Sequence, residues 1–109
     1  MKIYKMKDMI GGWFVGDFEP SVIRTKEYEV GYKCHKKGEE WPTHHHKIAT
    51  EITYVILGKI NIQGQIFEAG DIFVLEPNEI ADPTFLEDCC LVVVKTPSVI
   101  GDKYIEETK

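Results

Sequence analysis

The sequence lacks any long apolar run and shows almost no helical periodicity. Its longest apolar run, residues 89–94, is far shorter than the roughly 20 residues that a membrane-spanning helix needs. Residues 1–8 alternate lysine with apolar side chains and contain neither the apolar segment nor the small-residue cleavage site of an export signal. These absences predict a cytoplasmic protein that makes no contact with a membrane.

Positive charge is also scarce. The chain carries 18 acidic against 13 basic residues, a formal net charge of −5, and such a surface repels the phosphate backbone of DNA and RNA. We therefore expect no nucleic-acid partner. The content of 43% hydrophobic and 28% charged residues is ordinary for a folded domain, and 109 residues suffice for one core. This length excludes a second domain of the kind that binds a nucleotide.

Cysteine is sparse and irregularly spaced. Cys34, Cys89 and Cys90 form an odd set without the Cys-x-x-Cys spacing of many zinc and redox sites, and adjacent cysteines pair poorly with each other for geometric reasons. We expect three reduced residues that act as small apolar side chains in a reducing cytoplasm. A reactive thiol at Cys34 is the alternative, and a zinc site built from these cysteines is not expected.

Short apolar segments, many of them alternating, dominate what the sequence does contain. Gly, Pro and Asn interrupt them at intervals of roughly 8–12 residues, which is typical of a β-sandwich or small barrel. Gln63-Gly64 predicts a tight hairpin turn, because glycine accepts a positive φ, and residues 102–109 form a polar tail. The chain is therefore predicted to be all-β, with strands at residues 12–16, 22–25, 28–35, 43–47, 51–57, 59–62, 65–67, 72–75, 80–85 and 89–96.

The histidines are the most informative residues. In a strand, side chains two residues apart point to the same face, so His44 and His46 share one face and His45 points away. Glu51 follows five residues after His46, and a short connection would return it beside the histidines as the next strand begins. Two imidazoles and one carboxylate suit divalent iron, manganese, nickel or zinc. The sequence therefore predicts a metal site at His44, His46 and Glu51.

The spacing around these residues resembles the first motif of the cupin superfamily. From Gly38 to Gly58 the chain has the pattern Gly-x5-His-x-His-x4-Glu-x6-Gly. The resemblance implies an all-β cupin double-stranded β-helix, which is a jelly-roll barrel. It implies one domain over residues 1–109, with the motif-bearing core at about residues 38–96. It also implies a single divalent metal ion in the barrel.

The second cupin motif, normally Gly-x5-Pro-x-Gly-x2-His-x3-Asn, is matched only in part. From Gly70 onward the turn and the apolar strand agree, but Glu76 stands at the proline and Asn78 at the second glycine. Ala81 occupies the position of the histidine that usually supplies a fourth ligand. Asp82 is next to it, but it faces the other way along a strand unless a bulge intervenes.

Three functions are compatible with this resemblance. The first is a metal-dependent enzyme acting on a small molecule, since cupins include dioxygenases, decarboxylases, lyases and isomerases. The second is a metal-free isomerase or epimerase of nucleotide-linked keto-sugars, in which His44 or His46 exchanges protons with help from Tyr32 or Tyr54. The third is a binding module without catalysis. His44, His46 and Tyr32 are the candidate catalytic residues, and no single reaction is favoured.

Other side chains are assigned by the face of the strand on which they lie. Tyr32 and Cys34 are expected either to line the pocket or to pack in the core. His35, on the opposite face of the same strand, is expected to be exposed. Trp13 and Trp41 are expected to be core or interface aromatics, with stacking on a ligand as the alternative.

Two predicted strands lack a polar face. Residues 51–57 and 89–94 are apolar on both sides, whereas a barrel of this size has only one interior. The second apolar face therefore predicts packing against another copy of the chain, as a homodimer. Loops that cover the outer face are the alternative.

Overall fold

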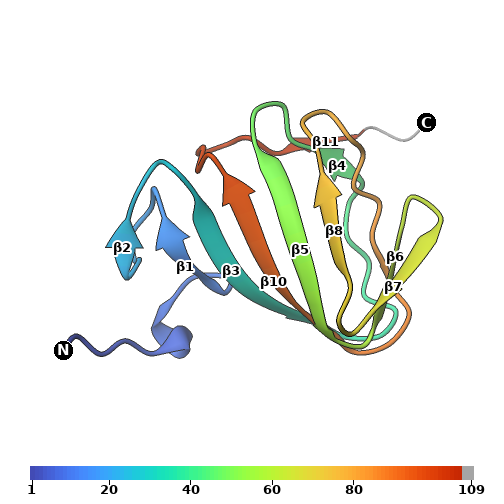
Figure 1. The fold of residues 1–109 in the computed structure, drawn as a ribbon, viewed down its shortest axis with the longest axis horizontal. Coiled ribbons are helices and arrows are strands. Elements are labelled where there is room, and N and C mark those ends of the chain that lie inside the picture. The colour runs from blue at the N-terminus through green and yellow to red at the C-terminus, as the bar shows by residue number, and fades with distance from the viewer. Residues whose placement is uncertain (107–109) are drawn as a thin grey trace.

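The computed structural model describes residues 1–106 and is built almost entirely from strands (Figure 1). These residues contain no α-helix, and no helical segment among them is long and apolar enough to cross a membrane. The elements in chain order are the 3₁₀ segment η1 (Met6–Asp8) and the strands β1 (Trp13–Gly16), β2 (Ile23–Arg24), β3 (Glu29–His35), β4 (His44–His45), β5 (Thr50–Leu57), β6 (Lys59–Ile62), β7 (Gln65–Glu68), β8 (Ile72–Leu75), β9 (Thr84–Phe85), β10 (Cys89–Thr96) and β11 (Tyr104–Ile105).

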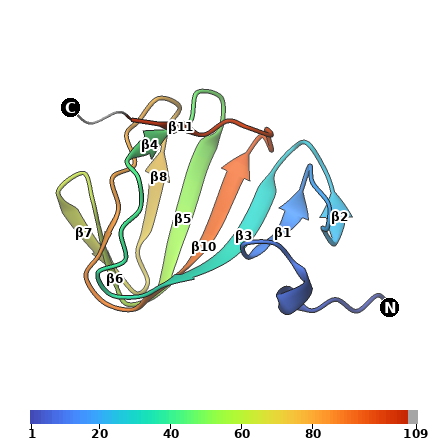
Figure 2. The same ribbon diagram turned by 180° about the vertical axis from the view of Figure 1, so that it is seen from behind.

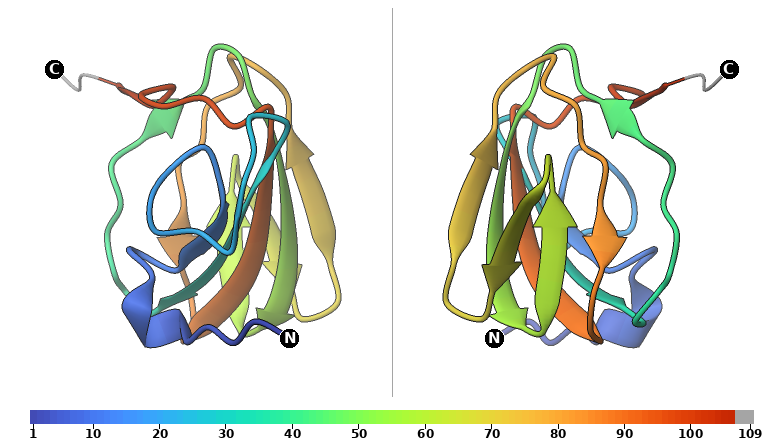
Figure 3. Two further views of the ribbon diagram at one scale, coloured as in Figure 1. Left: turned by 90° about the vertical axis from the view of Figure 1, so that its left-hand side faces the viewer. Right: turned by 90° about the vertical axis from the view of Figure 1, so that its right-hand side faces the viewer.

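The strands form one large sheet and two small ones. The six-stranded sheet has the order β2-β1-β3-β10-β5-β8 and is antiparallel except for the β1–β2 pair. The small sheets are β7-β6-β9 and β11-β4. Figures 2 and 3 show the large sheet curving around an interior that the small sheets cover from the other side. The predicted all-β jelly-roll barrel is confirmed.

Alternation along β5 and β10 decides which side chains enter the core. In β10, Leu91 and Val93 are buried while Val92, between them, points outward. In β5, Thr53 and Val55 are almost completely buried, at 1% and 0% exposure. Apolar burial of this kind is the main favourable contribution to folding. The core cluster consists of Val55, Ile60, Ile62, Phe73, Leu75, Ala81, Phe85, Cys89, Leu91 and Val93.

Two turns close the ends of strands in ways that require unusual backbone angles. Gln63 and Gly64 have φ angles of 52° and 75°, and they join β6 to β7, which confirms the predicted hairpin. Gly58 has a φ angle of 87°, and a Cβ atom there would lie 2.1 Å from the carbonyl oxygen of Asp88. Only glycine tolerates this approach. The final glycine of the first motif is therefore required by packing.

The C-terminal segment differs from the polar tail that the sequence predicts. Tyr104 pairs with His45 and Ile105 with His44, so β11 lies beside β4. Before it, the Asp102 carboxylate accepts hydrogen bonds from the backbone N–H groups of residues 47, 48 and 49 over 2.9–3.3 Å. The prediction is wrong for residues 102–106, because a two-residue strand among charged residues shows no periodicity. Residues 107–109 of the predicted tail lie outside the described residues.

The cysteine prediction is wrong for two of the three residues. Cys34 and Cys90 form a disulfide, because the antiparallel register of β3 and β10 places them opposite each other. Neither is a reduced apolar side chain, and Cys34 is not a reactive thiol. Cys89 is the free cysteine among residues 1–106; it is fully buried, and burial raises the pKa of its thiol.

Candidate functional site

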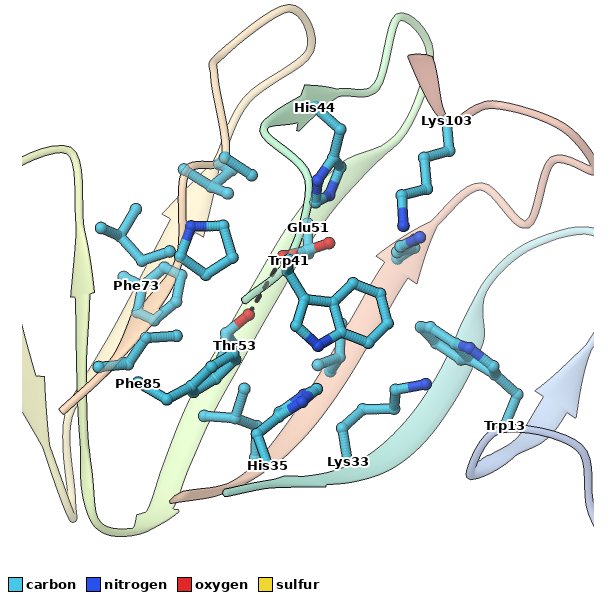
Figure 4. Close-up of a pocket in the computed structure, with 18 residues that line it drawn as sticks. Trp13, Lys33, His35, Trp41, His44, Glu51, Thr53, Phe73, Phe85 and Lys103 are labelled. Atoms are coloured by element: carbon cyan, nitrogen blue, oxygen red, sulfur yellow. Dashed lines mark hydrogen bonds between the residues drawn. The ribbon is translucent and has the colours of Figure 1, made fainter. Parts of the chain in front are cut away.

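A cavity of about 250 Å³ opens between the six-stranded sheet and the strands that cover it (Figure 4). This is the volume of about eight water molecules at roughly 30 Å³ each, so the cavity suits a small molecule. Strands of both layers contribute to its wall, which places it inside the barrel. Most of the lining is apolar and comes from Ile60, Ile62, Phe73, Leu75, Ala81, Pro83, Phe85, Leu91 and Val93.

His44 enters this cavity from β4. Its Nδ1 donates a hydrogen bond to the carbonyl oxygen of Pro42 at 2.9 Å, since a carbonyl oxygen can only accept. Nε2 of the neutral ring therefore keeps its lone pair. Burial lowers the pKa of His44, so the ring is neutral at pH 7. Figure 4 shows His44 pointing toward Glu51.

His46 lies beside His44 but faces a second hollow. The two ring centroids are 5.3 Å apart in an edge-to-face arrangement, so the two histidines are neighbours. His46 lines the neighbouring hollow together with Glu29 and Asp102, and it is not part of the barrel cavity. Burial, and after it the charge of Lys95, lower the pKa of His46 to about 4. Within residues 1–106, its buried Nε2 has no hydrogen-bond partner.

Glu51, at the start of β5, is the carboxylate that lines the barrel cavity. Thr53 Oγ1 donates a hydrogen bond to Glu51 Oε2 at 3.4 Å, drawn as a dashed line in Figure 4. Burial raises the pKa of Glu51, and the charge of Lys95 opposes this rise. In the part of the chain that the structure describes, no lysine or arginine forms an ion pair with Glu51. A half-buried carboxylate of this kind is stabilised by a nearby cation.

The three predicted metal ligands are neighbours but do not form a closed cluster. His44 and Glu51 share the barrel cavity, whereas His46 faces the hollow next to it. Among residues 1–106, no three His, Cys, Asp or Glu side chains lie close enough together to hold one metal ion. The donor chemistry itself fits a divalent metal. It offers two neutral imidazoles, one with an unpartnered buried nitrogen, and one half-buried carboxylate.

Ala81 stands where cupins usually carry a further histidine. It is 4% exposed, lines the barrel cavity and forms a β-bridge with His44 through two backbone hydrogen bonds of 2.9 and 2.7 Å. Asp82 is exposed, and its carboxylate accepts a hydrogen bond from the backbone N–H of Gln63 at 2.7 Å. No bulge turns Asp82 inward, so it is not a fourth donor.

The expected pocket role of Tyr32 and Cys34 is wrong. Tyr32 is 40% exposed, and neither residue lines the two cavities beside the histidines. Tyr54, the other tyrosine considered as a partner for the histidines, is also outside them at 44% exposure. The alternation of β3 is as predicted, but its phase is reversed: the apolar face points away from the barrel, and Lys33 and His35 point inward.

His35 is a cavity residue that the sequence analysis places incorrectly on the surface. Its ring stacks on Phe85 at a centroid distance of 4.1 Å, and its Nδ1 lies 2.5 Å from Glu39 Oε2. Trp41 Nε1 donates a hydrogen bond to the same oxygen at 2.5 Å. These two hydrogen bonds, first that of His35, lower the pKa of Glu39 to about 2. Alternation along β3 shows that His35 lies opposite the apolar residues of the strand, but it does not show which of the two faces points inward.

The tryptophans line the cavity, as the ligand-stacking alternative requires. Trp13 and Trp41 both contribute to its wall. Gly31 leaves the space for the first of them, since a Cβ atom there would lie 2.7 Å from the Trp13 ring. The missing side chain of Gly31 therefore positions an aromatic face at the cavity.

Comparisons with known proteins agree with this fold. A family model described as the ChrR cupin-like domain matches residues 26–100, more than half of the chain. A search of curated proteins gave no match.

Three of the similar solved structures illustrate the likeness. A conserved protein with a double-stranded β-helix domain from Klebsiella pneumoniae has a TM-score of 0.68 and 23% identity, over 77% of this chain and 74% of that one. The DMSP lyase DddQ from Ruegeria pomeroyi has a TM-score of 0.72 and 14% identity, over 87% and 51% of the two chains. The pirin YhhW from Escherichia coli, solved in complex with nickel(II), has a TM-score of 0.66 and 14% identity, over 80% and 39%.

At these identities the solved structures show a common fold and nothing finer. The chain spans about half of the lyase and less than half of the pirin. The family match is of a different kind, since it covers the histidine motif, the cavity strands and β10 together. The chain therefore belongs to the family of ChrR cupin-like domains within the cupin superfamily.

Proposed function

We propose that this cupin domain binds a small molecule in its barrel cavity, and that a divalent metal ion draws together His44, His46 and Glu51, which are neighbours but do not yet form a closed cluster. The observation that carries the metal proposal is Nε2 of His46, which is buried without a hydrogen-bond partner among residues 1–106. An unpaired buried polar atom costs roughly 1–3 kcal/mol. Coordination of a metal ion would remove this cost.

Each of the three residues has a definite part in this proposal. Iron, manganese, nickel or zinc would supply a Lewis acid that polarises an oxygen of the bound molecule. His44 would present Nε2, because its Nδ1 donates to Pro42. Glu51 would supply negative charge, with Thr53 restricting the orientation of its carboxylate. The apolar lining of the cavity would exclude bulk water from the bound molecule.

The metal content of protein purified without a histidine tag tests this proposal. His44→Ala and His46→Ala are expected to abolish stoichiometric binding in competition with a chelator. His45→Ala is the matched control and should retain the metal, because His45 contacts Glu106 and stacks on Tyr104. Equal loss in all three variants, or no metal in the wild-type protein at neutral pH, would overturn the metal proposal.

A gain-of-binding variant sharpens the same test. Ala81 lines the cavity opposite His44, so Ala81→His should add a donor and tighten metal binding. Asp82→Ala should leave the affinity unchanged, because the Asp82 carboxylate is bonded to the Gln63 turn. Weaker binding in Ala81→His with an intact fold would place the metal elsewhere.

The metal-free sugar enzyme receives less support. His44 is neutral at the cavity wall, as a general base requires. However, Tyr32 and Tyr54 lie outside the cavity, and most of its lining is apolar. Turnover of a nucleotide-linked keto-sugar by chelator-treated protein would favour this function. Thermal stabilisation by a ligand without turnover would favour a binding module.

We also propose that the domain pairs with a second copy through the outer face of the six-stranded sheet. That face is uncharged over four neighbouring strands, and Ile72 and Val74 there are 63% and 47% exposed. Contiguous apolar surface of this kind marks interaction sites, and a two-fold interface pairs one patch with itself. Two apolar rows cross the face in register, Tyr32–Val92–Tyr54–Ile72 and Val30–Val94–Ile52–Val74.

A further inference from the structure

Three lysines from separate segments line the barrel cavity. Lys33 comes from β3, Lys95 from β10, and Lys103 from the segment before β11. Their ammonium groups lie over aromatic rings: Lys33 and Lys95 are 5.2 and 5.0 Å from the Trp13 ring centroid, and Lys103 is 4.7 Å from that of Trp41. Figure 4 shows Lys33 and Lys103 reaching into the space beside the two tryptophans.

Unlike Lys36 and Lys59, these three lysines have no acidic partner. Lys36 is 3.9 Å from Asp88 and Lys59 is 3.7 Å from Glu87. Within residues 1–106 none of the three cavity lysines forms an ion pair. Contact with an aromatic face stabilises an ammonium group by roughly 0.5–1 kcal/mol, but it does not neutralise the charge.

The carboxylates near the cavity do not balance this charge. Among residues 1–106, Glu51 is the single carboxylate that lines the cavity, against three ammonium groups. Glu39 is already bonded to His35 and Trp41. Burial lowers the pKa of Lys33, and the charges of Lys95 and Lys103 lower it further, so the three groups are close enough to repel one another. A chain of net charge −5 thus concentrates positive charge at its barrel cavity.

Apolar walls and excess positive charge together define a class of ligand. We infer that the cavity binds a small organic anion, whose carboxylate or phosphate group lies among Lys33, Lys95 and Lys103 and whose apolar body contacts the aliphatic and aromatic lining. The inference rests on the proposal that the cavity binds a small molecule, and it names the class of that molecule. Charge-assisted hydrogen bonds would hold the anionic group, and burial of its apolar body would supply the rest of the binding free energy.

The test compares benzoate and phenyl phosphate with benzyl alcohol, an uncharged molecule of similar size, by calorimetric titration of the full chain in EDTA. At least one anion should bind about tenfold or more tightly than the alcohol, since a charge-assisted hydrogen bond contributes roughly 1.5–3 kcal/mol. Raising the salt concentration should weaken anion binding only. The better of the two anions identifies the acidic group that the site prefers. Equal affinity for the alcohol and both anions, or no binding of either anion, would overturn the inference.

Matched lysine variants locate the anion. Lys33→Met and Lys103→Met should each weaken binding of the better anion about tenfold, while Lys103→Arg should keep most of it because the charge remains. Lys59→Met, which removes a lysine paired with Glu87 outside the cavity, should change nothing. An equal effect of Lys59→Met, with native circular dichroism in all variants, would overturn the inference.

The use of EDTA separates this result from the metal proposal. A protein that binds no metal but prefers benzoate or phenyl phosphate would refute the metal site and support the anion site. A protein that binds metal through His44 and His46 but does not discriminate between anions and benzyl alcohol would support the metal site and refute the anion site.

Discussion

The inner and outer faces of the six-stranded sheet use the same strands in opposite ways. The inner face of β3 and β10 carries Lys33 and Lys95 at the cavity, although it faces the barrel interior. The outer face carries only apolar side chains over its two central rows, although Ile72 and Val74 are exposed. In an isolated soluble barrel the reverse is expected. Charge inside indicates a ligand, and apolar surface outside indicates a partner.

Replacing valine by glutamate should unfold the protein on the inner face of the sheet but only separate the dimer on the outer face. This difference is the largest effect that we expect. Val55→Glu places an unpaired charge at a site with 0% exposure, which costs roughly 3–5 kcal/mol and should unfold most of the protein. Val92→Glu, on the outer face, should leave a folded monomer. Circular dichroism and sedimentation velocity at micromolar concentration measure the two outcomes. A wild-type protein that sediments only as a 12.5 kDa species would overturn the dimer.

Substitutions of the neighbouring cysteines on β10 should give the next largest difference, in the free energy of unfolding. Cys90 is cross-linked to Cys34 across 56 residues, and opening a loop of this length should lower the free energy of unfolding by about 4 kcal/mol. Cys89→Ala removes a buried thiol and should cost only about 1 kcal/mol. Urea unfolding of Cys90→Ser and Cys89→Ala measures both values.

Alkylation of the denatured protein without reductant tests whether Cys34 and Cys90 are bonded to each other. It should label one cysteine of the three in the chain. Labelling of all three would contradict the disulfide and would support the predicted reducing cytoplasm instead.

Glu39 should give the smallest effect, and only in acid. The hydrogen bonds from His35 and Trp41 lower its pKa from 4.5 to about 2. A carboxyl group whose pKa is lower in the folded state stabilises the protein above about pH 4.5, and this contribution is lost as the pH falls toward 2. Glu39→Gln should therefore flatten the decline of Tm over this range. The exposed Glu40→Gln is the control, and equal flattening in both variants would show that the His35 contact is unimportant.

The sequence predicts those parts of the fold that depend on local patterns. Alternation in residues 51–57 correctly separates Thr53 and Val55 from Ile52 and Tyr54, because burial follows a period of two in a strand. The Gln63-Gly64 turn is local as well. Strand alternation also predicts that His44 and His46 are neighbours, and their rings are in contact at 5.3 Å, although they line different cavities.

Features that depend on pairing between distant segments are not predictable in this way. The Cys34–Cys90 bond requires the register of β3 against β10, and no local pattern specifies it. The prediction of which face of β3 points inward is wrong for a related reason. Hydrophobicity assigns the apolar face of β3, which includes Tyr32, to the barrel interior. Because the outer surface of this sheet is also apolar, an apolar face of β3 fits equally well on either side. Lys33 and His35 are therefore missed as cavity residues.

The attachment of residues 102–106 to the histidine strand has a consequence for biosynthesis. β4 finds its sheet partner in β11, Asp102 holds the backbone of residues 47–49, and Lys103 completes the lysine group. Residues 102–106 follow every strand of the six-stranded sheet in the chain, so they leave the ribosome after those strands. A nascent chain can therefore form that sheet early, but the cavity is complete only after residues 102–106 have been added.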